Sequence, residues 1–387
     1  MNILFYFISQ INPRCGGTER ATDNVAHGLR NRGHNIYYMS RTKVDGEYDV
    51  PCFFLPDING ITRQNIDYIN HFCKDYGIDT IINEAGNTDD VKLFSKEHIN
   101  GVRIITELHF SPYQNFKYYY RGTHLPLSIK NPKEIIVNLL KWIKAPYNKW
   151  MNWKRMIERY RYMYHHSDRV VVLSPAYIRE FAEIANLPDT TKLMAIYNPN
   201  SFITSAEPQT KDKIVLSIGR LDFAPKKVEY LIRIWKSIQP KHEEWKLLIC
   251  GDGPARHYLE NIVKKECVKG VSFEGNVSPK RVYEQASIMC MTSIYEGTPM
   301  VVIEAMQCRC IPMVYDTFAA AHDMIQDGED GYVIPPFDEE MYAQKLSYLM
   351  ENEDLRAKMG ANAINSSKRF DLNAIICKWE ELLCTLN

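Results

Sequence analysis

Two series of short apolar runs alternate with amphipathic stretches along this 387-residue chain, and this alternation limits the folds open to it. Apolar runs rich in β-branched and aromatic residues predict buried strands, and the amphipathic stretches between them predict helices. The first series predicts strands at 2–8, 35–40, 78–83, 102–106, 169–173 and 194–197. The second predicts strands at 213–218, 245–250, 271–274, 288–292, 311–314 and 332–334. Alternation of this kind predicts an α/β chain with two parallel sheets.

A polar, proline-containing stretch at 198–213 lies between the two series and predicts an interdomain linker. We therefore expect one Rossmann-like domain over 1–205 and a second over 206–367. Residues 368–387 include an amphipathic stretch with Trp379, which predicts a terminal helix.

The composition is that of an ordinary globular protein with zero formal net charge, which argues against a general role in binding polyanions. The ten cysteines form no paired Cys-x-x-Cys motifs, so we expect them to be reduced and buried, without a zinc site or disulfide framework. The chain opens on a predicted strand without a basic leader, and no apolar run reaches membrane-spanning length. These features predict a cytoplasmic protein, either free or peripheral on the inner face of the membrane.

Residues 111–166 differ from the rest of the chain in charge and aromatic content. They hold eleven Lys and Arg against two Glu, with eight Tyr and three Trp, so their net charge is +9 while the remainder carries −9. Tryptophan and tyrosine beside cations favour a headgroup interface with anionic lipid. A solvated basic face whose aromatics cap the core is an equally good interpretation, and base stacking on nucleic acid is a weaker one. We expect an anionic membrane surface or a lipid-linked partner, and no nucleic acid.

Glycines follow the predicted strands in both series, where open parallel sheets bind ligands. Gly16 and Gly17 follow the first strand, although their pattern is not a dinucleotide fingerprint. Arg220 follows a strand of the second series, and Lys226 and Lys227 come after it on a proline-containing loop. An arginine fork beside a lysine point charge suits a diphosphate. Taken singly, each loop is also explained as a tight turn with surface cations.

The stretch 293–312 carries two carboxylates, Glu296 and Glu304, with a Gly-Thr-Pro turn between them. If Pro299 lies in the first turn of a helix, the backbone N–H groups around it point at an anion. Those groups belong to Gly297, Thr298, Met300 and Val301. The alternative is a buried helix after a strand, in which Glu296 merely favours the positive helix end.

Taken together and in order, these loops resemble the retaining nucleotide-sugar glycosyltransferases of family 4, which have the two-domain GT-B fold. The matching segments are 16–20, 219–221 with Lys226, 251–254, 273–275, 296–299 with 304–306, and 327–335. The two glutamates separated by seven residues are the family's signature. The family places its lysine five positions after the arginine, where this chain has Pro225, so either the loop is longer here or Lys227 substitutes.

The resemblance implies Rossmann-like domains that face each other across a cleft. The domain over 1–205, which includes the basic aromatic segment 111–166, would be the acceptor side. The domain over 206–367 would bind the nucleotide-sugar donor, and the terminal helix in 368–387 would cross back to the first domain.

The resemblance also implies roles for the loops. Arg220 and Lys226 would hold the donor diphosphate, with the backbone at Gly16 and Gly17 approaching from the first domain. Glu304 would accept hydrogen bonds from the ribose hydroxyls. Asn276 and Val277 would lie near the base.

Two residues would lie near the transferred sugar. Glu296 would stabilise and position it, with sugar or phosphate oxygens bound by the N–H groups that follow. His109 matches the position where many family members carry a histidine near the reacting sugar. A single histidine at a strand end is otherwise more often structural.

The implied activity is retaining, metal-independent hexosyl transfer to a glycan or lipid-linked hydroxyl in cell-surface polysaccharide or glycolipid synthesis. We expect no cofactor and no metal, and the chain contains no Asp-x-Asp. Two alternatives remain: a GT-B epimerase or phosphorylase, and a glycan-binding or membrane-docking protein with an inactive site.

Overall fold

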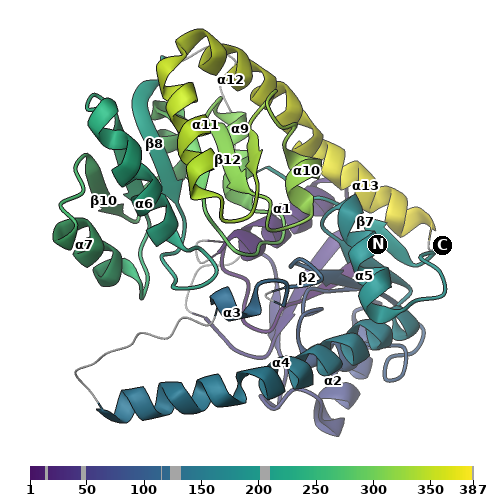
Figure 1. Cartoon of the computed structure of the whole chain (residues 1–387). Coiled ribbons are helices and arrows are strands. Elements are labelled where there is room, and N and C mark those ends of the chain that lie inside the picture. Colours follow the sequence, from purple (N-terminus) through teal and green to yellow (C-terminus); the bar gives the residue numbers. More distant parts are fainter. Residues whose placement is uncertain (14–15, 45–48, 115, 123–131, 201–209, 386–387) are drawn as a thin grey trace. The chain divides into compact units, whose positions relative to one another are not determined.

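The computed structural model describes residues 1–13, 16–44, 49–114, 116–122, 132–200 and 210–385 (Figure 1). Contacts divide the chain into two compact units. Unit 1 comprises Met1–Tyr113, Ala145–Ser201 and Phe370–Asn387, and unit 2 comprises Gln114–Lys144 and Phe202–Arg369. The 201–209 part of the expected linker lies outside the described residues.

Unit 1 contains a parallel seven-stranded sheet in the order β3-β2-β1-β4-β5-β6-β7. Its strands are β1 (Asn2–Tyr6), β2 (Asn35–Ser40), β3 (Cys52–Phe54), β4 (Thr80–Asn83), β5 (Arg103–Leu108), β6 (Arg169–Val172) and β7 (Leu193–Ala195). The strand order reverses direction between β1 and β4. The carboxyl ends of these strands therefore border the crevice where such sheets bind ligands.

The helices of unit 1 cover both faces of this sheet. They are α1 (Gly17–Asn31), α2 (Arg63–Asp75), α5 (Pro175–Ala185) and α13 (Leu372–Thr385), with the 3-10 turn η1 (Asp89–Lys92). Helix α13 joins the core of α1 and the sheet through Ile376 and Trp379. Gly28 of α1 permits this packing, because a Cβ atom there would lie 2.4 Å from Ile376 Cδ1. The terminal helix thus belongs to the first unit, as the fold predicts.

Unit 2 contains a second parallel sheet, of six strands, in the order β10-β9-β8-β11-β12-β13. Its strands are β8 (Asp212–Ile218), β9 (Lys246–Cys250), β10 (Val271–Gly275), β11 (Ala286–Met291), β12 (Ile311–Tyr315) and β13 (Tyr332–Ile334). Its helical elements are α3 (Tyr119–Gly122), α6 (Val228–Ile238), η2 (Gln239–Lys241), α7 (Arg256–Lys265), α8 (Pro279–Gln285), α9 (Met300–Gln307), α10 (Ala320–Met324), α11 (Glu339–Glu351) and α12 (Glu353–Ser367), and η3 (Lys368–Phe370) spans its end. Trp235 and Trp245 anchor its core.

Helix α4 (Pro132–His166) is 35 residues long and spans the boundary between the two sets of residues. Gln114–Lys144 groups with unit 2, where the Arg121 guanidinium lies 4.0 Å over the Phe337 ring. In the described part of the chain, no helix combines the length and apolarity needed to cross a bilayer.

The predicted α/β class with two parallel sheets is confirmed, with two differences in the strands. The sequence reading missed β3, which is only three residues long. It also ended the strand before Glu107, whereas β5 continues because Glu107 pairs with Val171. The expectation that the cysteines are buried was wrong for Cys267, Cys377 and Cys384, which are exposed, and for Cys52, which is half-buried. Cys15 lies outside the described residues.

Candidate active site

The loops that follow β8 and β9 in unit 2 lie directly against each other. Gly219 has φ 143° and Gly251 has φ 126°, values that favour glycine. A Cβ atom on Gly251 would lie 2.0 Å from the Gly219 carbonyl oxygen. Two glycines are therefore required for the loops to approach, and they bring Arg220 to the carboxyl end of the sheet.

Arg220 presents an accessible guanidinium at this edge. Its side chain is 73% exposed, and its Nε lies 3.2 Å from Asp222 Oδ2. An exposed ion pair of this kind is weak, so the guanidinium can exchange its partner for a ligand oxygen.

Lys226 and Glu296 form an ion pair between the loop after β8 and the loop before α9. The Lys226 Nζ lies 2.6 Å from Glu296 Oε1, and the two side chains are 23% and 12% exposed. Lys227, by contrast, is buried at the N-cap of α6, with its Nζ 3.4 Å from Glu229 Oε1. Of the two lysines, Lys226 is the one that keeps access to solvent.

Helix α9 begins one residue later than the sequence predicts. Pro299 is its N-cap, and the amide of Val302 donates to the Pro299 carbonyl at 3.0 Å. Met300 and Val301 therefore contribute the first amides of the helix, which have no acceptor within it. Gly297 and Thr298 precede them and are buried.

Glu304 lies inside α9 and is only 1% exposed. Its Oε2 accepts a hydrogen bond from the Tyr283 hydroxyl of α8 at 3.1 Å. Sequence reasoning missed Tyr283, because a tyrosine in a short helix carries no signal that it faces a carboxylate 21 residues away. The contact holds the Glu304 carboxylate in one orientation.

Asn276 and Val277 follow Gly275 at the end of β10. Gly275 has φ 66°, and its carbonyl accepts from the Gly251 amide at 2.6 Å. Asn276 is exposed and Val277 is half-buried. This loop thus joins the two glycine loops at one edge of the sheet.

In unit 1, Gly16 and Gly17 form the start of α1. Gly16 is the extended N-cap and Gly17 the first helical residue. A Cβ atom on Gly16 would lie 2.2 Å from Glu19 Oε2, so the Glu19 side chain folds over the N-cap.

His109 directly follows β5 and is buried, with a side chain only 4% exposed. Its Nε2 is in direct contact with Glu84 Oε2, and its Nδ1 lies 3.8 Å from Glu107 Oε1. Burial lowers the pKa of His109, while the carboxylates of Glu107 and Glu19 oppose this shift. Burial raises the pKa of Glu107 to about 8, and Glu84 adds to the shift.

Glu84, Glu107 and His109 form the one group of three potential metal ligands among the described residues, within 4.8 Å of one another. The direct contact between Nε2 and a Glu84 oxygen is a hydrogen bond, and two ligands of one metal ion are held farther apart. We therefore interpret the group as a hydrogen-bonded cluster.

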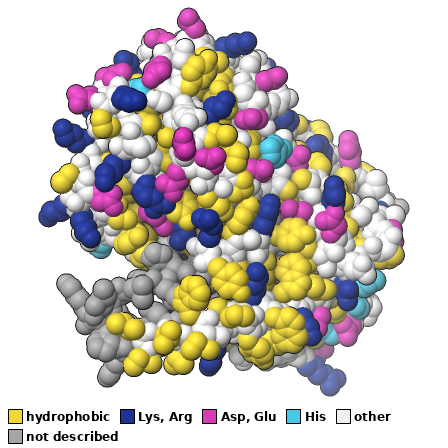
Figure 2. Space-filling view, in the orientation of Figure 1, with side chains coloured by type: hydrophobic (Ala, Val, Ile, Leu, Met, Phe, Trp, Pro, Cys, Tyr) yellow, Lys and Arg dark blue, Asp and Glu magenta, His cyan; other side chains and the backbone are white. Residues whose placement is uncertain are grey.

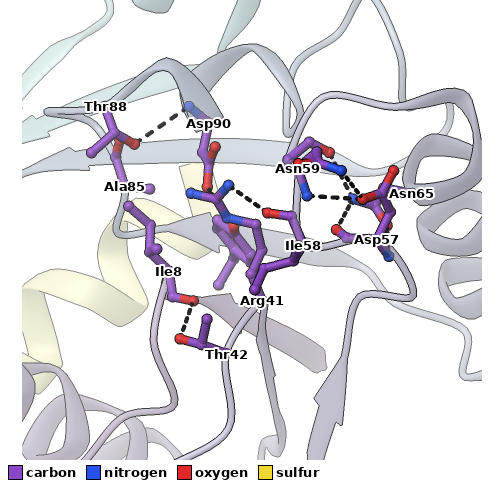
Figure 3. Close-up of polar contacts among 12 residues, drawn as sticks. Ile8, Arg41, Thr42, Asp57, Ile58, Asn59, Asn65, Ala85, Thr88 and Asp90 are labelled. Carbon is purple, nitrogen blue, oxygen red and sulfur yellow. Dashed lines mark hydrogen bonds and ion pairs between the residues drawn. The ribbon is translucent and has the colours of Figure 1, made fainter.

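A second polar cluster that the sequence did not reveal lies near the carboxyl ends of β1, β2 and β4 (Figure 3). The Tyr6 hydroxyl donates to Asp90 Oδ2 at 2.6 Å, and Arg41 Nε lies 3.1 Å from the same oxygen. Arg41 also donates to the Ile58 carbonyl at 3.0 Å. Burial raises the pKa of Tyr6, and the Asp90 charge adds to it. This cluster connects residues from three segments of unit 1, and the Arg41 and Asp90 charges neutralise each other.

Helix α4 carries a run of exposed apolar side chains, and Figure 2 shows hydrophobic atoms along it. The exposed residues are Ile136, Val137, Leu139, Leu140, Trp142, Ile143, Tyr147 and Trp150. Leu139 and Ile143 are 60% and 68% exposed. Lys141 and Lys144 lie among them and are also exposed. The Nζ of Lys154 lies 3.9 Å from the Trp150 ring centroid.

Comparison with known proteins agrees with this geometry. Residues 201–366 match the family model for glycosyl transferases group 1. An uncharacterised glycosyltransferase of Haemophilus influenzae is 24% identical over 99% of this chain and 100% of its own length. The structure of Anabaena HepE in complex with UDP-glucose aligns over 100% of both chains, with a TM-score of 0.73 and 17% identity.

The chain is a glycosyltransferase with the GT-B fold. A second curated relative of this glycosyltransferase is the Campylobacter jejuni GalNAc-alpha-(1->4)-GalNAc-alpha-(1->3)-diNAcBac-PP-undecaprenol alpha-1,4-N-acetyl-D-galactosaminyltransferase. The two are 34% identical over 47% of this chain, and the alignment spans about half (50%) of the relative's length.

Proposed function

We propose that this glycosyltransferase transfers a hexose-type sugar, with retention and without a metal, from a nucleotide diphosphate sugar to a glycan or lipid-linked hydroxyl. The process it would serve is the synthesis of a cell-surface polysaccharide or glycolipid. The observation that carries the proposal is the Lys226–Glu296 ion pair at the sheet edge, beside the exposed Arg220.

The charges at this edge suit departure of a diphosphate. As the glycosidic bond breaks, negative charge grows on the diphosphate and positive charge on the sugar ring. Arg220 and Lys226 would stabilise the diphosphate, together with amides at the start of α9. Glu296, released from Lys226, would stabilise and position the sugar. We do not assign it as a nucleophile.

The remaining donor contacts are proposed from the family resemblance. Glu304, oriented by Tyr283, would accept from the ribose hydroxyls. Asn276 and Val277 would border the base. Unit 2 would therefore be the donor side, and unit 1 the acceptor side, contributing Gly16, Gly17 and His109.

A lipid-linked acceptor is supported by two observations. The name of the Campylobacter relative specifies a PP-undecaprenol acceptor. The exposed apolar side chains of α4, interleaved with lysines, also suit the headgroup region of an anionic membrane. We propose that α4 docks the enzyme peripherally on the cytoplasmic face of the membrane.

A donor panel read by thermal shift tests the donor assignment. One nucleotide diphosphate sugar should raise the Tm, and Arg220→Ala or Glu304→Ala should reduce that shift. Lys236→Ala is a matched control, because Lys236 is an exposed cation on α6 paired with Glu266 at 3.1 Å. Absence of binding across the panel, or binding unchanged in both site variants, would refute the proposal.

Vesicle sedimentation tests docking through α4. Binding should require anionic lipid and weaken as salt is added, because surface charges are screened. Replacing Leu139 and Ile143 with Ser should reduce it, and the same replacement at the exposed Tyr348 of α11 should not. Equal binding to neutral vesicles would remove the electrostatic part of the proposal.

Product analysis separates this activity from the two alternatives. A transferase gives a glycosylated acceptor with the donor's anomeric configuration. An epimerase would change the donor without an acceptor, and a phosphorylase would require inorganic phosphate. A binding protein with an inactive site would show no turnover.

A further inference from the structure

Three titratable side chains are buried together at the carboxyl ends of β4 and β5 in unit 1. Glu84 follows β4 directly, Glu107 is in β5, and His109 follows β5. Glu84, Glu107 and His109 are only 4%, 6% and 7% exposed, respectively. Two carboxyls side by side in a dry environment are costly unless their charge is compensated.

In the part of the chain that the structure describes, neither Glu84 nor Glu107 forms an ion pair with a Lys or Arg, and the basic group beside them is the His109 imidazole. Burial lowers the pKa of His109 and so disfavours a charge on that imidazole. One oxygen of each carboxyl lies within 4.8 Å of the other and of a His109 ring nitrogen, and two carboxyls this close in a buried site favour retention of one proton. Burial raises the pKa of both groups, in agreement with retention of that proton at neutral pH.

Among the described residues, only one of the two ring nitrogens of His109 has a hydrogen-bond partner. Its Nε2 contacts Glu84 Oε2 directly. Its Nδ1 has no hydrogen-bond partner among the described residues and is 3.8 Å from Glu107 Oε1, too far for a hydrogen bond. Glu84 therefore determines the orientation of the ring.

We propose that Glu84 and Glu107 hold one proton between them, and that Glu84 is a positioning residue that fixes His109 as its Nε2–H tautomer. Glu107 keeps the proton and donates it to Glu84. Glu84 carries the single negative charge and accepts the Nε2 proton of the neutral imidazole. Nδ1 is left with a lone pair, as an acceptor.

This arrangement rests on the proposed function for its role in transfer. A histidine near the reacting sugar would then offer an acceptor, Nδ1, to a sugar or acceptor hydroxyl. The cluster would also carry one fixed negative charge, which stabilises the positive charge that develops on the sugar ring. The Glu19 carboxylate of α1 opposes the lowering of the His109 pKa, and it would add to the negative electrostatic potential near the ring.

Close packing holds the cluster in place. A Cβ atom on Gly86 would lie 2.3 Å from the Glu107 carbonyl oxygen, so only glycine lets the loop after β4 approach β5. The side chain of Met163 lies behind this contact, 3.1 Å from the same Cβ position. The loop after β4 therefore packs directly against β5, and this packing keeps Glu84 in contact with His109.

Histidine NMR tests the tautomer without any assay of activity. With ¹⁵N-histidine labelling, the signal lost in His109→Gln identifies this ring. We expect a neutral Nε2–H tautomer at pH 7 that becomes a mixture of tautomers in Glu84→Gln. An Nδ1–H tautomer in the wild type, or a ring unaffected by Glu84→Gln, would overturn the proposal even if transfer occurs as proposed.

Steady-state kinetics with a donor that the thermal-shift panel identifies test the consequence for transfer. Glu84→Gln removes the anchoring charge and should lower kcat by about 100-fold, with KM little changed. Glu107→Gln keeps a donor toward Glu84 and should lower kcat by only about threefold, while removing a kcat change near pH 8. A larger loss in Glu107→Gln than in Glu84→Gln would contradict the assignment of the charge to Glu84.

Two controls separate these effects from misfolding. Glu97→Gln changes an exposed carboxyl that accepts from Tyr162 at 2.6 Å, and kcat should be unchanged. Each variant should also melt cooperatively. If Glu84→Gln does not fold, Glu84→Asp, which keeps the charge but shortens the reach, should show the same NMR change, and an unaltered ring there would overturn the proposal.

Discussion

Carboxylates in the two units are compensated in opposite ways. In unit 2, Glu296 is partly exposed and pairs with the Lys226 ammonium. In unit 1, Glu84 and Glu107 are buried, and in the proposed cluster they share a proton. Partial exposure lets both ions of a pair keep some hydration, whereas full burial favours the neutral acid. A glutamate in unit 2 can therefore lose its ion-pair partner to a ligand, whereas the glutamates in unit 1 are held in a fixed arrangement.

The difference follows from position on the two sheets. Glu296 lies on a loop before α9, where in the proposed mechanism a donor phosphate would replace it as the partner of Lys226. Glu107 lies within β5, hydrogen-bonded into the sheet beside Val171. A ligand can rearrange the first contact but not the second. Four predictions test this contrast, beginning with the largest expected effect.

Removing the Lys226 ammonium should have the largest effect on transfer. Lys226→Ala should lower kcat/KM by about 1000-fold, or about 4 kcal/mol, because a charge on the departing diphosphate loses its partner. Lys226→Arg should recover part of this loss. The measurement is steady-state transfer, with Lys236→Ala as the exposed-lysine control. A loss below about fivefold would mean that Lys226 serves only to pair with Glu296.

The shared proton should make stability depend on pH. Burial raises the pKa of Glu107 from its ordinary value of 4.5 to about 8, so the folded state should hold an extra proton between these values. The free energy of unfolding should therefore fall as pH rises from 4.5 to 8, by at most about 1.4 kcal/mol per pH unit. Denaturant melts of the wild type minus those of Glu107→Gln isolate this slope. A difference that rises with pH would refute the shared proton.

Removing one hydrogen bond to Glu304 should have a modest effect. Tyr283 is fully buried, so Tyr283→Phe keeps its shape and removes only the hydroxyl. The loss of about 1 kcal/mol predicts a donor KM about fivefold higher with kcat unchanged. Tyr342→Phe, which removes a buried hydroxyl bonded to Met313, is the control and should leave KM unchanged.

Metal removal should have the smallest effect. Cations of the chain take the place of a metal in the proposed mechanism, so dialysis against EDTA should change the rate by less than about twofold. A loss of activity that added Mg²⁺ or Mn²⁺ restores would instead make the transfer metal-dependent.

Much of the fold was predictable because its signals are local. Runs of β-branched and aromatic residues located twelve of the thirteen strands that the described residues form, and the glycines after them located the loops of the candidate site. The missed strand, β3, is too short to have a periodic pattern. The start of α9 was displaced by one residue, because proline fits both the N-cap and the first turn.

Partnerships between side chains were not predictable. Nothing in the spacing of Tyr283 and Glu304 marks a hydrogen bond, and nothing in the sequence pairs Tyr6 with Asp90. The sequence also did not show which of Lys226 and Lys227 is accessible, whereas in the structure Lys227 is buried at the N-cap of α6.

The sequence by itself determined the two sheets, their order along the chain and the glycine loops at their carboxyl ends, because periodicity and backbone restrictions act over a few residues. Only the tertiary structure decided which charges meet. Burial and pairing depend on segments far apart in the chain, as with Lys226 and Glu296, which are 70 residues apart. For Glu84 and Glu107, burial side by side favours a pair of carboxyls that keeps one proton.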